Sequence, residues 1–163
     1  MRWKFLESPA DDGPGNMALD EALMTRAAQT GEAVFRVYSW SGATLSLGRN
    51  QRARGDYDLD AARARRISIV RRPTGGRALL HDREITYSAT MPVSSAVDAQ
   101  TAYEFVNAVL LDSLTALGVP AVRATGTERI PPGLRPCFDA PSEDEIVVNG
   151  RGKQPRYPRV HLF

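Results

Sequence analysis

Apolar side chains recur at helical spacing in two long segments of the chain. The first covers residues 17–29, with Asn16 as the predicted N-cap and Gly31 just past its end. The second covers residues 98–118, and Gly118 ends it. Its apolar face is formed by Tyr103, Val106, Leu110, Leu114 and Leu117. These periodicities predict two long amphipathic helices.

Alternation of apolar and polar residues predicts strands between and after these helices. In residues 33–40, one face carries Val34, Arg36 and Tyr38 and the other carries the residues between them. Residues 41–48 follow as a hairpin turn and a second strand. Further strands are predicted at 3–8, 67–70, 77–81, 84–92, 119–125 and 145–150, and a short helix at 59–66. This order implies an α+β (α/β layer) fold, in which helices pack on a mixed, largely antiparallel sheet.

The last fifteen residues depart from this patterning. They carry four arginine or lysine side chains, no acidic ones and two prolines, and they show no periodicity. A chain of 163 residues is long enough for one domain that buries about two-thirds of its unfolded surface. We therefore assign residues 1–151 to a single domain and residues 152–163 to an atypical basic tail.

The net charge of +2 is too small to indicate a nucleic-acid partner. The basic residues are unusual in kind, because nineteen are arginines and only Lys4 and Lys153 are lysines. A genome whose base composition favours arginine codons is the simplest explanation. The alternative is that some of the arginines bind anions through their planar guanidinium groups.

Cys137 is the only cysteine in the sequence, so no internal disulfide is possible. This favours a reducing compartment. The N-terminal residues have no apolar run typical of a signal peptide, and no segment approaches the roughly 20 apolar residues that a membrane span requires. We therefore expect a cytoplasmic protein with no membrane association.

The segment RRPTGGRALLHD, residues 71–82, is the clearest candidate for chemistry. Gly75 and Gly76 have no Cβ atom, so their main chain can present N–H groups to a ligand at contact distance. Arg71, Arg72 and Arg77 add guanidinium groups suited to a carboxylate or a phosphate. The glycine pair alone leaves a second interpretation open, an ordinary β-hairpin turn with solvated arginines.

Together with its neighbours, this segment resembles the signature of the biotin/lipoate protein ligase superfamily. The string RRPTGGRALLHDREITYS is similar to that family's Arg-Arg-x-x-Gly-Gly-x-Ala-x-x-His-Asp pattern. Three more segments agree in order and spacing, namely GNMALDEAL (15–23), FRVYSWSGATLSLGRNQ (35–51) and PCFDAPSEDEIVVNGR (136–151). The resemblance covers residues 3–151 and implies a biotin/lipoate-ligase-like catalytic domain.

Within the superfamily, the CFDAPS segment at Cys137 resembles the cysteine-dependent octanoyltransferases. Lipoate ligases activate the acid with ATP and need no nucleophilic cysteine. A thiolate reacts readily with a thioester and exchanges one thioester for another with little change in free energy. The alternative for a lone cysteine is a small, buried hydrophobic side chain.

The resemblance also implies roles for the residues of the diglycine segment. Arg72, Gly75, Gly76 and His81 would line the acyl and carbonyl end of the site, and Arg77 would add to substrate binding. The main chain of the two glycines is the candidate for holding an oxyanion. The alternative for His81 is a histidine at a strand end, bonded to Asp82 or to a carbonyl group.

The sequence departs from the family pattern after VVNGR, where the family continues with a lysine and a Gly-Ser-Ala box. Here GRGKQPRYPRVHLF follows, with Lys153 one place later than the pattern has it and no Gly-Ser-Ala box. We keep Lys153 as a catalytic candidate that supplies positive charge to the oxyanion or the thiol. We expect the domain to be incomplete at its C-terminus, truncated or frame-shifted after Arg151, with little or no transferase activity.

The function implied is transfer of an octanoyl group from acyl carrier protein, through a cysteine thioester, to a lysine of a lipoyl-domain protein. The acceptor expected is a protein such as the glycine-cleavage H protein. No cofactor, metal or nucleic acid is expected. Two alternatives remain open at this point: a lipoate–protein ligase relative that uses ATP and Mg²⁺, and a non-catalytic module that binds an acyl group or a carrier protein.

Overall fold

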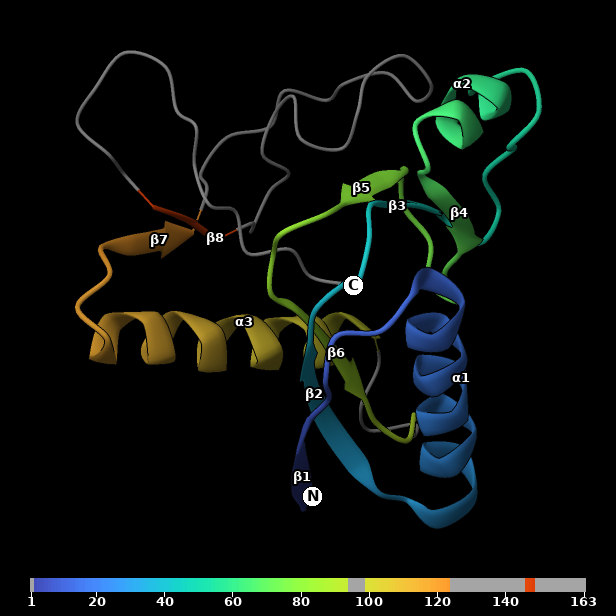
Figure 1. Cartoon of the computed structure of the whole chain (residues 1–163). Helices are drawn as coiled ribbons and strands as arrows, with labels where there is room; N and C mark the ends of the chain where they lie inside the picture. The colour runs from blue at the N-terminus through green and yellow to red at the C-terminus, as the bar shows by residue number, and fades with distance from the viewer. Residues whose placement is uncertain (1, 94–98, 124–145, 149–163) are drawn as a thin grey trace. The chain divides into compact units, whose positions relative to one another are not determined.

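The computed structural model of the chain describes residues 2–93, 99–123 and 146–148. They fall into two compact units that divide between Pro92 and Val93 (Figure 1). The N-terminal unit contains the diglycine segment. The predicted boundary between residues 151 and 152 lies outside the described residues.

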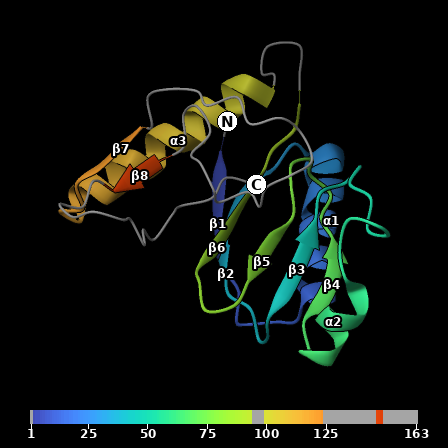
Figure 2. The same ribbon diagram turned by 90° about the horizontal axis from the view of Figure 1, so that it is seen from above.

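The N-terminal unit contains two mixed, three-stranded sheets (Figures 1 and 2). In the first sheet, β2 (Ala33–Tyr38) pairs in parallel with β1 (Trp3–Glu7) and antiparallel with β6 (Thr86–Thr90). In the second sheet, β3 (Thr44–Leu47) pairs in parallel with β4 (Ser68–Arg71) and antiparallel with β5 (Leu79–His81). The predicted strands and the α+β class are therefore confirmed.

The hairpin predicted for residues 41–48 is wrong, because β2 and β3 belong to different sheets. Period-two alternation identifies a strand, but it carries no information about the partner of that strand. Here Ser41 and Gly42 lie in a bend between the two sheets, and Ser41 N–H donates to the carbonyl of Asp11. The turn residues thus mark a change of sheet.

Helix α1 (Gly13–Thr30) begins earlier than predicted. Asp12 is its N-cap, and the Asp12 carboxylate accepts a hydrogen bond from the N–H of Gly15 at 2.8 Å. Asn16, the predicted N-cap, is instead fully buried inside the helix. Asp12 is the N-cap residue because a proline follows it in the first turn of the helix, where a missing N–H is tolerated. At the other end, Gly31 adopts a left-handed conformation with φ 73°, as a helix-ending glycine does.

A buried polar network joins α1 to the first sheet. Arg36 on β2 is 1% exposed, and its guanidinium donates to the carboxylate of Asp20 at 2.8 Å and to the side-chain oxygen of Asn16 at 2.7 Å. Tyr38 and Ser88 also donate to Asp20, at 3.2 and 2.7 Å. Burial and the neighbouring Asp20 carboxylate raise the pKa of Tyr38 above its ordinary value. Since a buried charge is costly without a partner, this network fixes the position of α1 on the sheet.

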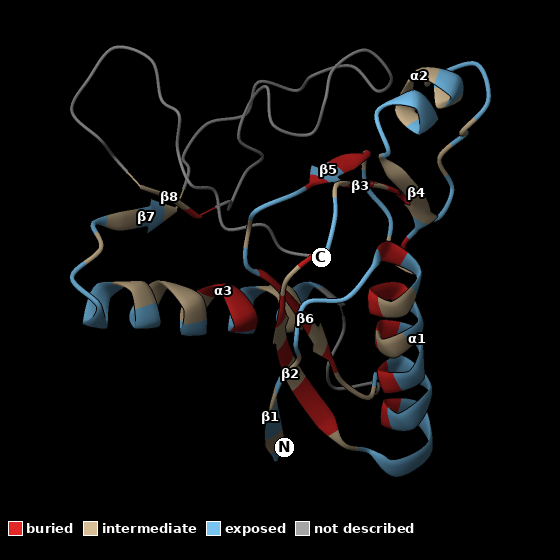
Figure 3. Ribbon diagram, viewed as in Figure 1, coloured by how far each residue is buried: buried red, intermediate tan, exposed pale blue. Residues whose placement is uncertain are grey.

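Helix α1 also contacts the second sheet. Met17 packs with Tyr38, Trp40 and the β4 residue Val70 in one apolar cluster. At the start of the helix, a Cβ atom added to Gly13 would lie 2.8 Å from Val70. Figure 3 shows the buried residues of α1 on the side that faces the strands, whereas the short helix α2 (Leu59–Ala64) has none.

The C-terminal unit contains helix α3 (Ala99–Ala116) and the antiparallel pair β7 (Ala121–Arg123) and β8 (Ile146–Val148). Gly118 has a φ of 74° just after α3, so the predicted end of this helix is confirmed. The strands pair with Val122 opposite Val147. Val106 on α3 and Ile146 on β8 are buried.

Candidate functional site

The diglycine segment lies at the end of the second sheet. Strand β4 ends at Arg71, and the N–H of Arg72 still bonds to the carbonyl of Leu47 on β3, at 2.9 Å. The chain then turns through Gly75 and Gly76 before it returns as β5. The central strand β3 also carries the buried residue Ser46, which lies opposite Leu79 on β5. This arrangement brings the ends of three strands together around the turn.

The buried guanidinium of Arg72 donates hydrogen bonds to the main chain of the turn. The Arg72 side chain is 5% exposed, and all five of its guanidinium N–H groups face acceptors of the protein. Two donate to the carbonyl of Gly75, at 3.2 and 2.8 Å, and one to the carbonyl of Arg77, at 2.7 Å. The others donate to the carbonyl and hydroxyl oxygens of Ser46, at 3.1 and 3.3 Å. Arg72 therefore ties the turn to the central strand.

These bonds also set the direction of the peptide groups in the turn. In a trans peptide, the C=O and the following N–H point in opposite directions. Because the carbonyl of Gly75 points to Arg72, the N–H of Gly76 points away from the guanidinium. Both glycines are exposed, and in the described part of the chain no hydrogen bond occupies the N–H of either glycine. The turn thus has the carbonyl of Gly75 directed inward and the N–H of Gly76 available to an anionic atom.

A second loop fixes the turn from the other side. A Cβ atom added to Gly48 would lie 2.0 Å from the carbonyl oxygen of Gly76, so only glycine allows the two main chains to lie this close. The N–H of Arg49 donates to the carbonyl of Thr74 at 2.8 Å. Arg71 donates to the carbonyl of Gly48 at 2.6 Å and to two more carbonyls of the same loop. Gly76 has a φ of 93°, a conformation that glycine adopts without strain.

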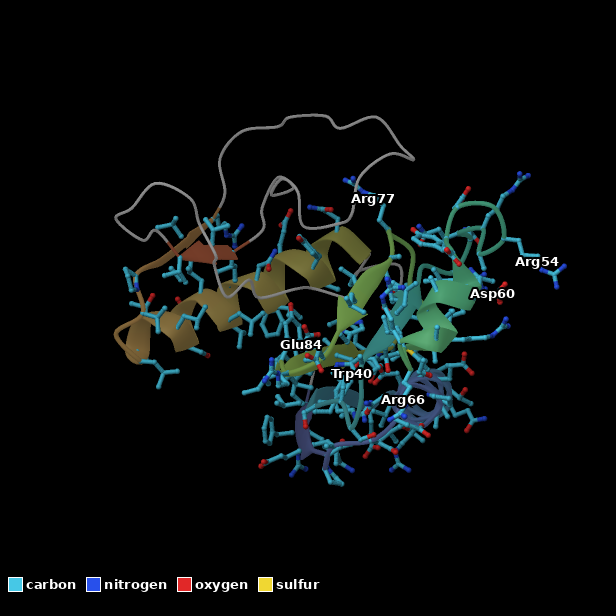
Figure 4. The ribbon with its side chains drawn as sticks, turned by 45° about the horizontal axis from the view of Figure 1, so that its top comes forward. Trp40, Arg54, Asp60, Arg66, Arg77 and Glu84 are labelled. Atoms are coloured by element: carbon cyan, nitrogen blue, oxygen red, sulfur yellow. The ribbon has the colours of Figure 1, made fainter. Side chains whose placement is uncertain are left out.

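His81 lies at the end of β5 and is 2% exposed. Its Nε2 atom bonds to the hydroxyl of Ser46 at 2.8 Å, and its Nδ1 atom bonds to the carboxylate of Glu84. The indole ring of Trp40 stacks on the imidazole, with ring centroids 4.1 Å apart. Trp40 in turn donates to Thr86 at 2.7 Å, and the Thr86 hydroxyl donates to Glu84 (Figure 4 labels Trp40 and Glu84).

One tautomer of neutral His81 satisfies all of these contacts. The Ser46 hydroxyl accepts from Arg72, which has no acceptor atoms, so its own O–H is free to donate to Nε2 of His81. The Nδ1–H then donates to the Glu84 carboxylate. The result is a continuous chain of hydrogen bonds from the diglycine turn to the start of β6, which we call the Arg72–Glu84 network.

The structure thus brings together five of the residues predicted from the sequence: Arg72, Gly75, Gly76, Arg77 and His81. Cys137 and Lys153 lie outside the described residues. Sequence reasoning missed Ser46 and Glu84. A serine inside an apolar strand and a glutamate three residues after the motif histidine were the only signals for them.

No group of three or more His, Cys, Asp or Glu side chains among the described residues is arranged to hold a metal ion. No helix in the described ranges is long and apolar enough to cross a membrane.

Comparison with known proteins identifies the family. The sequence profile of the lipoyl protein ligase A/B catalytic domain matches residues 12–152. Octanoyltransferase LipM of Staphylococcus aureus is 41% identical over 160 residues, which cover 91% of this chain and 58% of that protein. Octanoyltransferase LipM of Kyrpidia tusciae is 40% identical over 159 residues, with the same coverage. The chain therefore spans 58% of the length of these curated relatives.

Solved structures agree with the sequence comparison. A crystal structure of lipoate-protein ligase A bound with ATP has a TM-score of 0.67 and 25% identity, covering 89% of this chain and 55% of that one. A bi-partite lipoate protein ligase from Thermoplasma acidophilum has a TM-score of 0.69 at 22% identity, which shows the same fold, over 91% of this chain and 51% of that one. With most of its length matched in both sequence and fold, the chain belongs to the lipoyl protein ligase A/B catalytic-domain family.

Proposed function

We propose that the chain belongs to an octanoyltransferase of protein lipoylation, in which Cys137 carries the acyl group as a thioester. The observation that carries the proposal is the 41% identity to an octanoyltransferase over 91% of this chain. The geometry of the diglycine turn supports it, because the turn offers a main-chain N–H to a developing negative charge.

The reaction proceeds by two acyl transfers. The Cys137 thiolate attacks the carbonyl carbon of the octanoyl thioester on the donor, and the donor thiolate leaves and takes up a proton. The amino group of an acceptor lysine then attacks the Cys137 thioester. An amide bond forms, the amine loses a proton, and the cysteine thiol is restored. Each step passes through a tetrahedral intermediate with a negative oxygen.

The diglycine turn is suited to that oxygen. The N–H of Gly76 points away from Arg72, and its direction is fixed before the substrate arrives by the bonds from Arg72 to the carbonyls of Gly75 and Arg77. A preorganised donor needs no rearrangement as charge develops, and removal of one such donor typically slows a reaction by about 100- to 1,000-fold. We assign to Lys153 the positive charge that lowers the thiol pKa or stabilises the oxyanion.

Acyl carrier protein is the proposed donor, and a lipoyl-domain protein such as the glycine-cleavage H protein is the proposed acceptor. The transfer needs no cofactor, because the donor thioester already holds the acyl group in activated form. The second candidate function is an ATP- and Mg²⁺-dependent ligase, which the similarity to lipoate-protein ligase A favours. The proposed site of action is the cytoplasm.

Octanoyl transfer to a purified lipoyl domain tests the proposal. The chain is incubated with octanoyl-acyl carrier protein and the acceptor without ATP, and the acceptor mass is followed over time. The proposal predicts octanoylated acceptor with the wild-type chain and none with Cys137→Ser, a result that would overturn the expectation of little or no activity drawn from the departure after Arg151. Transfer that needs ATP and free octanoate, and that survives Cys137→Ser, would favour the ligase.

A further inference from the structure

The loop before α2, the helix itself and the residues after it form one exposed basic surface, residues 49–66, which we call the arginine lobe. It carries six arginines, all exposed: Arg49, Arg52, Arg54, Arg63, Arg65 and Arg66. Its only acidic residues are three aspartates, so its net charge of +3 exceeds the +2 of the whole chain. Figure 4 shows Arg54 extending outward from the loop.

The aspartates of the lobe do little to neutralise it. Asp58 caps α2 by accepting from the N–H of Ala61 at 2.8 Å, and Asp60 pairs with Arg63 at 2.8 Å. In the described parts of the chain, five arginine side chains of the lobe have no ion pair: Arg49, Arg52, Arg54, Arg65 and Arg66. Their positive charge is therefore directed to solvent and available to an anionic partner.

Arg66 gives an independent reason to regard this charge as functional. Its φ of 58° makes it the only residue other than glycine with a positive φ in the described ranges. This conformation costs an ordinary side chain roughly 1 kcal/mol, and glycine would adopt it freely. An exposed arginine thus occupies a position where the fold alone favours glycine.

The lobe is attached directly to the diglycine turn. The N–H of Arg49 bonds to the carbonyl of Thr74, and Arg71 bonds to the carbonyls of Gly48, Arg49 and Gln51. A partner that docks on the lobe is consequently held next to the turn that we assign to the acyl carbonyl.

From this charge and placement we infer that the arginine lobe docks the acidic surface of the acyl-donor carrier protein. The inference rests on the proposed function. The chemistry of the two partners favours the donor, because its thioester hangs on an arm joined to the protein by a phosphodiester, an anion. The acceptor contributes a lysine amine to the reaction, which offers the arginines no anion to bind.

The test compares two variants with equal loss of charge. Arg52→Gln/Arg54→Gln removes two exposed arginines from the lobe, and Arg2→Gln/Arg26→Gln removes two from elsewhere in the same unit. Octanoylation of Cys137 is measured with two donors, octanoyl-acyl carrier protein and the small uncharged thioester octanoyl-N-acetylcysteamine. The variant Arg66→Gly adds a third measurement, because it removes a charge and relieves backbone strain, so it should fold at least as well as the wild type.

The inference predicts that the lobe variant reacts about tenfold more slowly with the carrier protein at low salt, an effect that high salt removes. Its rate with the small thioester stays at the wild-type value, and the control variant matches the wild type with both donors. Arg66→Gly slows the carrier reaction alone. Equal rates for the lobe and control variants with the carrier protein, or equal slowing of the lobe variant with both donors, would overturn the inference.

The experiment also separates this inference from the proposed function. If neither donor acylates Cys137 in the wild-type chain, the proposed function fails, and binding of octanoyl-acyl carrier protein is then measured directly by calorimetry. Binding that weakens in the lobe variant and not in the control supports the lobe as a docking surface. Absent or unchanged binding contradicts it, as does a lobe that binds single-stranded RNA and not the carrier protein.

Discussion

The close approach of Gly48 and Gly76 makes one substitution especially informative. In Gly48→Ala, the added methyl group would lie 2.0 Å from the carbonyl oxygen of Gly76, whereas ordinary contact begins at 3.4 Å. The two loops must therefore move apart by the difference, about 1.4 Å. Because both atoms in conflict are held by main chain, no side-chain rotation can relieve the contact.

The size of the effect follows from the bonds between the loops. The bond from Arg49 N–H to the carbonyl of Thr74 is 2.8 Å long, and a shift of this size takes it beyond hydrogen-bond range. Loss of that bond costs about 1 kcal/mol, and overpacking costs about 1–3 kcal/mol. We expect Gly48→Ala to lower the free energy of unfolding by about 3 kcal/mol, which corresponds to a fall in Tm of roughly 10 °C.

Urea unfolding followed by tryptophan fluorescence measures this loss. Both tryptophans lie in the N-terminal unit, and Trp40 stacks on His81 near the affected loops. Gly75→Ala is the matched control, because no atom lies within 4 Å of its added Cβ and its φ is not left-handed. We expect the control to stay within about 0.5 kcal/mol of the wild type. If Gly48→Ala unfolds at the same urea concentration as the control, the described approach of the two loops is wrong.

Three further predictions concern stability, each measured by urea unfolding. Asp20→Ala leaves the buried Arg36 without its carboxylate partner and should lower the free energy of unfolding by about 3–5 kcal/mol. The double variant Asp20→Leu/Arg36→Met should recover most of that free energy. Equal losses in the single and the double variant would contradict the buried ion pair. Ser46→Ala leaves Nε2 of His81 buried without its hydroxyl partner and should cost about 1–3 kcal/mol, and no loss would refute the Arg72–Glu84 network. Hydrogen bonds from Arg26 and Lys4 lower the pKa of Glu32 to about 2. The ionised Glu32 therefore contributes fully to folding stability above its ordinary pKa of 4.5, and this contribution disappears as the pH falls towards 2. The difference in unfolding free energy between wild type and Glu32→Gln should shrink over that pH range, and a constant difference would refute the pairing.

The sequence predicted the elements of the fold far better than their partners. Helix α1 was recognised from its periodicity, but several residues of the N-cap type preceded its apolar positions, Asp11, Asp12 and Asn16 among them. The proline two residues after Asp12 was the signal that decided between them. Strand alternation located β2 and β3 correctly, and yet these strands joined different sheets. Pairing between distant strands depends on how α1 packs, and α1 contacts both sheets through Met17.

In the candidate site too, the motif residues were predicted from the sequence and their contact partners were not. The motif residues Gly75, Gly76 and His81 were identified from the sequence, because glycine pairs and family patterns are visible in a string of letters. Ser46 and Glu84 were not, because the contact of Ser46 with His81 arises from the register of β3 and β5, and the contact of Glu84 arises from the turn after β5. The hydrogen bonds from Arg72 to the carbonyls of the turn could not be predicted either, because a main-chain carbonyl has no sequence signature.

The mass of the intact chain after incubation with octanoyl-acyl carrier protein without ATP shows whether Cys137 accepts the acyl group. Cys137 is the only cysteine, so a thioester adduct has one possible position. We expect a gain of one octanoyl group that hydroxylamine removes and that Cys137→Ser does not acquire. An unmodified wild-type chain, or an adduct that persists in Cys137→Ser, would contradict this expectation.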